Sequence, residues 1–235
     1  GSILFKVCIR EDIYLSIEGL QNKSHMEAYK KELRFSPRDV WRLALNLVYK
    51  SSDKFKNFVM TNYPDVNPPW NQDEQRLRDV LDIVWGSRMG KGNKTYSANY
   101  IIKRTSDAQG RLFPRTFVQL FREAILEAKK SQVSTDRVLS PQRLTHGVEQ
   151  ASSQRTTDLV TEYGELKAVF DAMKGMRANF DRKYFDNHMK AHFKGPDAKT
   201  IIANALVQLE TIGVLSKSST EESWSVALMY RSGMG

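Results

Sequence analysis

Residues 197–226, "DAKTIIANALVQLETIGVLSKSSTEESWSV", combine a helix pattern with a hairpin pattern. The apolar residues of the first half recur at the spacing of one helix face, and that face is expected to point inward. They are Ile201, Ile202, Ala205, Leu206 and Leu209. Gly213 is expected to end the helix, because glycine accepts the left-handed backbone of a helix C-terminus. The residues that follow alternate around a polar turn at 218–222, as two short strands would.

The segments on the N-terminal side complete this pattern. "DRKYFDNHMKAHF", residues 181–193, is expected to be a helix, and Gly195-Pro196 a turn. Further upstream, one helix is expected to begin at Ser140-Pro141 and another at Ser152 or Ser153. Three helices followed by a hairpin are the order of a winged helix. Residues 161–235 are therefore predicted to form a winged-helix domain.

Residues 37–160 are predicted to form a helical bundle. Ser36 is expected to cap the first helix, with Pro37 at its first position and an apolar stripe behind it. A connector holding three of the seven prolines separates this helix from the next, which Gly86 is expected to end. The expected helices lie at 37 to about 51, 73–86, 97–105 and 114 to about 131, before those that begin at 140 and 152 or 153.

The N-terminal residues have a different character. "ILFKVCI", residues 3–9, is the only strong strand pattern in the first 210 residues and fits a buried strand of an α/β sheet. Gly1-Ser2 is typical of a protease-cleavage remnant and indicates a piece of a longer protein. Residues 1–36 are therefore expected to be the remnant of an α/β core. Its strand would pack on this chain's own helices or pair with a second copy in a homodimer, with the homodimer favoured.

Composition limits the function classes. The 235-residue chain is 40% hydrophobic and has no apolar run as long as a membrane span. Its single cysteine, Cys8, excludes an internal disulfide and a cysteine-based zinc site, and favours a reducing, cytoplasmic compartment. The net charge of +9 suits nucleic acid, phosphate-bearing ligands or an acidic partner surface.

Three basic groups are candidates for anion binding. Arg10 and Asp12 follow the strand, where α/β sheets place ligand-contacting groups; alternatively they only end it. Arg88, Lys91 and Lys94 lie in the glycine-rich loop "GSRMGKGNK", which could wrap phosphates or could be a flexible basic loop, and which lacks Walker A spacing.

The third candidate is Arg115 in "FPRTF", residues 113–117. The proline suits the first position of a helix, but the helix dipole disfavours a cation there. An arginine at that place is explained if it serves an anion. Otherwise it is a surface arginine paired with a carboxylate.

No catalytic or metal motif is identifiable. His188 and His192 have i, i+4 spacing, but no HExxH pattern or third ligand accompanies them. No nucleophile and base pair and no paired-carboxylate motif is present. The sequence therefore predicts neither catalytic residues nor metal ligands in this chain.

Four segments carry a resemblance to a known family. They are "KVCIREDIYLSIEGLQNKSH", "LRFSPRDVWRLALNLV", "VWGSRMGKGNKTYSANYIIKRTSDAQGRLFPRTFVQLFREA" and "LSPQRLTHGVEQASSQRTTDLVTEYGEL". Together they resemble the C-terminal half of bacterial P-loop ATPases of the AAA/STAND or partitioning-ATPase-like type, a helical lid followed by a winged helix. The resemblance implies that Arg10 and Asp12 lie at a sensor position and that Arg115 is similar to a sensor arginine of the lid. The family's Walker A and Walker B motifs, which serve ATP and Mg²⁺, are absent from this sequence.

Two functions are therefore expected. The first is a nucleotide-sensing and partner-coupling region of a P-loop ATPase, without catalysis or cofactor of its own. Its partners would be the upstream ATPase core and a protein bound by the winged helix. The second is a stand-alone winged-helix DNA-binding protein, with Lys199 and Asn204 on its recognition helix. Three carboxylates argue against DNA binding, because they oppose contact with phosphates: Glu210, Glu221 and Glu222.

Overall fold

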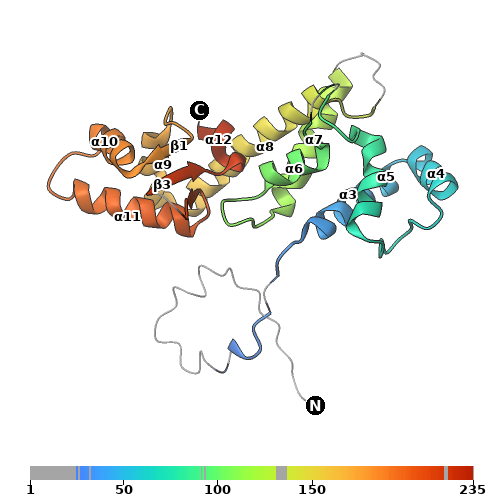
Figure 1. The fold of residues 1–235 in the computed structure, drawn as a ribbon, viewed down its shortest axis with the longest axis horizontal. Helices are drawn as coiled ribbons and strands as arrows, with labels where there is room; N and C mark the ends of the chain where they lie inside the picture. The colour runs from blue at the N-terminus through green and yellow to red at the C-terminus, as the bar shows by residue number, and fades with distance from the viewer. Residues whose placement is uncertain are drawn as a thin grey trace. The chain divides into compact units, whose positions relative to one another are not determined.

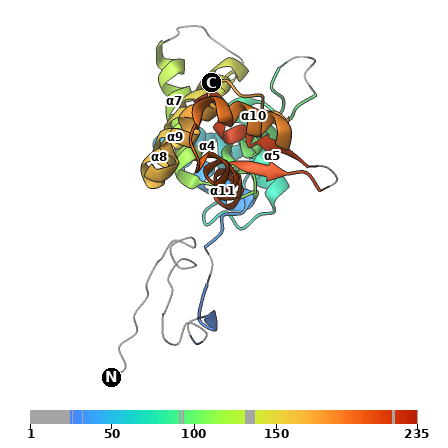
Figure 2. The ribbon, with the colours of Figure 1, turned by 90° about the vertical axis from the view of Figure 1, so that its left-hand side faces the viewer.

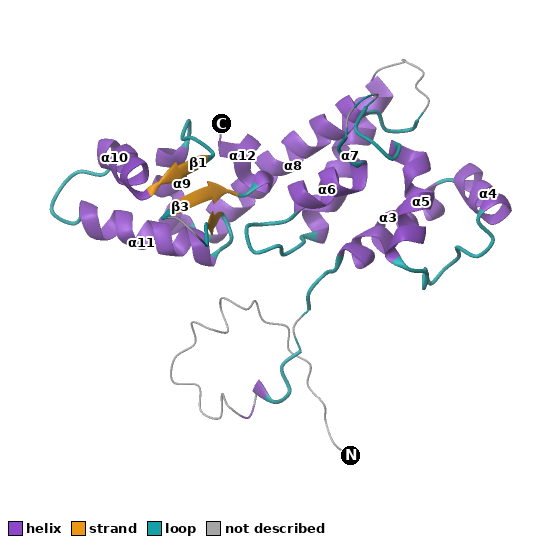
Figure 3. Ribbon diagram, in the orientation of Figure 1, coloured by secondary structure: helices purple, strands orange, loops and turns teal. Residues whose placement is uncertain are grey.

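The computed structural model describes residues 25, 27–31, 33–90, 92, 94–130, 137–219 and 222–234. These residues are mainly helical with one small antiparallel sheet, in agreement with the mainly α class (Figures 1 and 3). Arg34–Gly235 form one compact unit. The expected strand at 3–9, Arg10, Asp12 and Lys91 lie outside the described residues.

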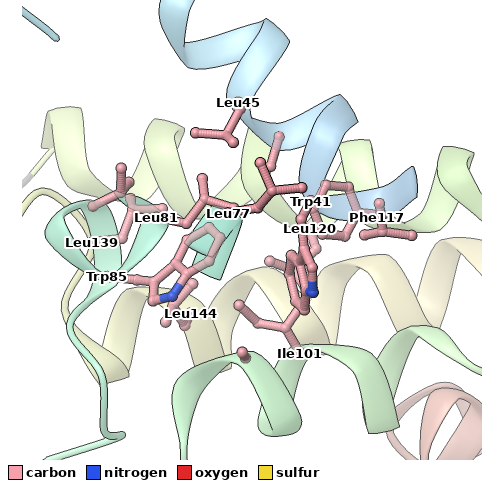
Figure 4. Close-up of a cluster of buried hydrophobic side chains, with 14 of the residues drawn as sticks. Trp41, Leu45, Leu77, Leu81, Trp85, Ile101, Phe117, Leu120, Leu139 and Leu144 are labelled. Carbon is pink, nitrogen blue, oxygen red and sulfur yellow. The ribbon is translucent and has the colours of Figure 1, made fainter. Parts of the chain in front are cut away.

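The first hydrophobic cluster is built by the helices of residues 37–151. They are α3 (Pro37–Ser51), α4 (Asp53–Asn62), α5 (Glu74–Trp85), α6 (Ser97–Thr105), α7 (Pro114–Lys130) and the first half of α8 (Pro141–Glu162). Figure 4 shows the aromatic centre, where the Trp41 ring lies 5.9 Å from that of Trp85 and 6.2 Å from that of Phe117. These large rings hold the helices together through buried apolar contact.

Most helix ends follow the sequence signals. Ser36 and Asp39 form a capping box at the start of α3, and Gly86 ends α5 with a φ of 75°. Helix α4 was not expected. It begins because Ser52 accepts a hydrogen bond from the amide of Phe55, so that a second cap follows directly on the end of α3.

Helix α8 is continuous, so the expected start of a second helix at Ser152 or Ser153 is wrong. The hydroxyls in this segment donate to carbonyls one turn earlier instead of capping a new helix. These bonds run from Thr156 to Ser152, from Thr157 to Ser153 and from Thr161 to Thr157, each 3.0 Å long. Helix α8 contributes to the first hydrophobic cluster through Leu144 and to the second through Leu159.

The second hydrophobic cluster contains all the described strands. Its elements are η1 (Gly164–Leu166), α9 (Lys167–Met173), β1 (Asn179–Asp181), α10 (Arg182–His192), α11 (Ala198–Thr211), β2 (Leu215–Lys217), β3 (Ser223–Val226) and α12 (Leu228–Met234). The sheet has the order β1-β3-β2 and is antiparallel throughout, with Phe180 opposite Trp224 and Ser216 opposite Ser225. Figure 2 gives a view nearly along α11, beside the β2–β3 hairpin.

Three details of this region differ from the sequence expectations. Strand β1, which is three residues long, was not expected, and neither was α12. Ile201 was expected to point inward but is 41% exposed, whereas Ile202 is buried. Neighbouring helix residues are about 100° apart around the axis, so the core accepts one of the two.

A short loop joins the two clusters. The loop, residues 106–113, contacts the C-terminal end of α11: the Ala108 amide donates to Gly213 O at 2.8 Å, and Arg111 Nη2 to Ile212 O at 3.0 Å. Arg111 Nε also lies 2.5 Å from Oδ2 of Asp107, whose side chain is fully buried. Gln109 Nε2 donates to Glu210 O at 2.7 Å. We call this set of contacts the 106–113 clasp.

Candidate functional site

Arg115 occupies the first turn of α7. Pro114 begins the helix, so the arginine lies where the helix dipole leaves partial positive charge. Its side chain is 82% exposed, and its Nη1 is 3.5 Å from Oδ2 of Asp158 on α8, which is 17% exposed. This ion pair matches the surface-pair alternative, but it is long and its arginine is mostly exposed to solvent, and such pairs contribute little stability.

A hollow of about 200 Å³ lies between α7 and α8 beside this pair. We call it the α7–α8 hollow. Its charged lining consists of Arg115, Arg122, Arg155 and Asp158, and Gln119 and Gln154 add side-chain amides. Three cations face one carboxylate, so the hollow has an excess of positive charge. It is suited to an anionic group that accepts several hydrogen bonds.

The three arginines differ in how much of their charge is already compensated. Arg155 Nη1 lies 3.4 Å from Glu162 Oε1, and the guanidinium lies 4.6 Å from the ring centre of Phe113. Its Nε is buried and forms no hydrogen bond with any described residue. Arg122 is exposed and forms no ion pair within the described part of the chain. Arg122 and Arg115 are thus the more available cations.

Asp158 is held in position by its own helix. Gln154 Nε2 donates to Asp158 Oδ1 at 2.9 Å, and the other carboxylate oxygen, Oδ2, is the one that pairs with Arg115. An anion entering the hollow would compete with this carboxylate for Arg115. The residues can bind and orient an anion, and none of them is a nucleophile placed beside a base.

The glycine-rich loop forms a separate structure. The backbone pairs Arg88 with Tyr96, and the Met89 amide donates to Thr95 O at 3.1 Å, so residues 88–89 run antiparallel to residues 95–96; we call this pairing the 88–96 hairpin. Arg88 donates to Lys94 O at 3.0 Å and to the Tyr96 hydroxyl at 3.2 Å. The structure therefore brings Arg88 and Lys94 together. Lys199 lies on the exposed side of α11, in the second cluster.

The histidine pair has a structural contact. His188 Nε2 is 2.8 Å from Ala172 O, and the His188 and His192 rings are 5.4 Å apart. Within the described ranges, no group of three or more His, Cys, Asp or Glu side chains is arranged to hold a metal ion. Every helix in those ranges is too short or too polar to cross a lipid bilayer.

Sequence reasoning identified Arg115 but missed the other charged residues of the α7–α8 hollow. Arg115 and Arg122 are seven residues apart, two helix turns, so their shared face was readable from the spacing. Arg155 and Asp158 come from a different helix, and only the packing of α8 on α7 brings them to the site. Comparison with protein families, curated proteins and known structures found no match to this chain.

Proposed function

We propose that this chain is the nucleotide-sensing and partner-coupling region of a P-loop ATPase, with a helical lid at 37–160 and a winged helix at 161–235. One observation carries the proposal: Arg115 is exposed at the N-terminal end of α7, beside a hollow that holds two more arginines and one carboxylate. The terminal phosphates of a nucleotide are anions of the kind that this charge excess favours. An ATPase core upstream in the same polypeptide would supply them.

The described residues fit the phosphate groups of the expected ligand but not its Mg²⁺ ion. The arginines of the α7–α8 hollow fit phosphate oxygens. Mg²⁺ prefers oxygen ligands, carboxylates above all, and no group of three or more His, Cys, Asp or Glu side chains among the described residues is arranged to hold a metal ion. The phosphate loop and the Mg²⁺ ligands would therefore belong to the upstream core, and the chain alone would not hydrolyse ATP.

The second cluster supports the winged-helix assignment. Helices α9, α10 and α11 precede the β2–β3 hairpin, and β1 adds a third strand on the other edge of β3. The loop at 218–222 would be the wing. A helix-plus-hairpin module of this kind presents one exposed helix, here α11, to a partner.

Helix α8 supports coupling between the two regions. Asp158 lines the α7–α8 hollow, and its neighbour Leu159 is buried in the second cluster. On the same helix, Ser152 Oγ accepts a hydrogen bond from the Gly233 amide at the end of α12. A shift of α8 that follows release of Arg115 would therefore move residues of both clusters.

The alternative, a stand-alone DNA-binding winged helix, rests on exposed Lys199 and Asn204 on α11. The charge distribution favours a protein partner for this region. Residues 161–235 contain 10 Lys and Arg against 9 Asp and Glu, whereas residues 37–160 contain 20 against 13. A nearly neutral module gains little from counterion release on DNA.

The test uses the full-length protein. We expect Arg115→Ala to lower kcat for ATP hydrolysis about tenfold or more, because it removes a charge near the transferred phosphoryl group. The matched control is Arg182→Ala, which removes another arginine, partly exposed, that is paired with an aspartate, Asp186, at 2.8 Å. Equal turnover of wild type and Arg115→Ala would contradict the proposal, as would the absence of a Walker A motif upstream in the gene.

A further inference from the structure

We propose that a second site, separate from the α7–α8 hollow, binds single-stranded nucleic acid. The site is the groove beside the 88–96 hairpin, with a volume of about 560 Å³. Its walls come from the hairpin, from α6 and from the first turns of α8. It shares no lining residue with the α7–α8 hollow, so it goes beyond the proposed nucleotide-sensing role.

The first argument is charge. Between Asp82 and Asp107 the sequence has no acidic residue, but it has five basic ones. Four of these are described residues: Arg88 and Lys94 in the hairpin, and Lys103 and Arg104 in the last turn of α6. Lys94 and Lys103 are exposed. This segment supplies the positive charge that a phosphodiester-binding surface needs, and the one carboxylate among the residues that line the groove, Glu149, comes from α8.

The second argument is the aromatic content of the same surface. Tyr96 occupies the N-cap position of α6 and is 45% exposed, and Tyr100 follows one helix turn later on the same side. The Arg88 guanidinium lies 4.4 Å from the Tyr96 ring centre, and that of Arg104 lies 3.8 Å from the Tyr100 ring centre. Guanidinium planes and aromatic rings are the groups on which unpaired bases stack.

The third argument is the groove itself. Its lining mixes apolar and hydrogen-bonding groups with one cation and one carboxylate, and includes Met89, Thr95, Tyr100, Arg104, His146 and Glu149. The Tyr100 hydroxyl donates to Thr145 Oγ1 at 3.2 Å, which fixes the ring between α6 and α8. The volume is within the range of small-ligand pockets, and one nucleobase with its sugar is a ligand of that size.

These three features together favour a single strand. A duplex hides its bases, so it would use the charged rim and leave the groove empty. An acidic peptide would likewise use only the charges. A single strand places phosphates along Lys94, Lys103 and Arg104 and can turn one base into the groove.

The first experiment measures binding by fluorescence anisotropy with the whole chain. The probes are a dye-labelled oligothymidylate, a duplex of equal length and a polyglutamate peptide. We expect Lys94→Glu/Lys103→Glu to weaken oligothymidylate binding about tenfold or more and to lower the salt slope by roughly 0.7 per lost phosphate contact. The matched control is Lys190→Glu/Lys194→Glu, which changes the net charge equally at exposed positions of the second cluster and should change binding less than about twofold.

The second experiment separates stacking from charge. We expect Tyr96→Leu to weaken binding about fivefold or more with an unchanged salt slope, and Tyr96→Phe, which keeps the ring, to bind like wild type. Equal losses in the two double lysine variants would overturn the proposal. So would tighter binding of the duplex or of polyglutamate than of oligothymidylate, or no binding of oligothymidylate at about 50 mM salt. None of these outcomes bears on ATP hydrolysis or Arg115.

Discussion

Tyr230 is the residue whose chemistry depends most on the fold. It lies on α12, and its side chain is fully buried in the second hydrophobic cluster. Burial raises the pKa of its phenol from 10.0 to about 12, because the phenolate would lose its hydration, and nearby Arg155 opposes this shift only in part. The folded protein therefore holds the phenol in its neutral form.

This pKa shift predicts a loss of stability at alkaline pH. The folded pKa is higher than the unfolded pKa of about 10, so the stabilisation is complete below pH 10 and is lost as the pH rises towards 12. We expect the free energy of unfolding to fall by about 2–3 kcal/mol over this range from Tyr230 alone. Urea unfolding of wild type and Tyr230→Phe from pH 9 to 11.5 measures it. Parallel pH curves for the two proteins would contradict the assignment.

The residues of the candidate site were predictable only where one helix carries the signal. Arg115 stands out because a cation directly after a helix-starting proline is unfavourable. Nothing in the sequence distinguishes Asp158, its partner, from other helix aspartates. Its position beside Arg115 depends on the contact between α7 and α8. Tyr230 gave no signal, because the burial of α12 is set by tertiary packing.

At the scale of elements, the approach of α7 and α8 depends on Gly147. A Cβ at this position would lie 2.4 Å from Leu120 O and 3.1 Å from the Cβ of Ala124. Glycine within a helix normally costs stability relative to alanine. Here the missing side chain lets the two backbones approach closely, one helix turn before Ala151, which lines the α7–α8 hollow.

We therefore expect Gly147→Ala to destabilise the protein by about 1–3 kcal/mol, in spite of the better helix propensity of alanine. The control is Gly164→Ala, because a Cβ at Gly164 would meet no atom within 4 Å. Thermal unfolding of both variants gives the comparison. A Gly147→Ala protein as stable as wild type would show that the helices separate at little cost.

The sequence predicted helices best where caps mark their ends. The bounds expected for α6 were correct, and α7 and α10 differed by about one residue, because Pro114, Asp181 and the turns beside them are strong local signals. Helix α8 was divided wrongly because Ser152 and Ser153 resemble caps when their bonding is unknown. Strand β1 has only three residues, too few for an alternating pattern, and it exists through its pairing with β3.

At the scale of the whole molecule, the 106–113 clasp ties the two hydrophobic clusters together at Gly213. Its φ is +80°, and a Cβ there would lie 2.4 Å from Asp107 Oδ2 and 2.7 Å from Arg111 Nη2. Asp107 Oδ2 is the acceptor of the Asp107–Arg111 ion pair, and Arg111 Nη2 donates to Ile212 O, so both atoms anchor the loop. The end of α11 must therefore carry glycine for both backbone and steric reasons.

Gly213→Ala tests the clasp against a variant with the same backbone strain. Gly175 has a φ of +77°, and a Cβ there would meet nothing within 4 Å. We expect Gly175→Ala to cost about 1 kcal/mol and Gly213→Ala at least twice that, because only the second displaces the Asp107–Arg111 pair. Urea unfolding of both variants measures the difference. Equal losses would mean that the clasp adjusts freely.

The continuity of α8 also decides how the molecule can be divided. A cut inside α8 would divide one helix between the two pieces, because Leu144, Val148 and Ala151 pack in the first cluster, whereas Leu159 packs in the second and Ser152 accepts a hydrogen bond from Gly233 of α12. Each piece would then hold only part of α8, the helix that contributes apolar side chains to both clusters. Separate expression of the two regions would require α8 in both pieces, each time with half of its apolar side chains facing water.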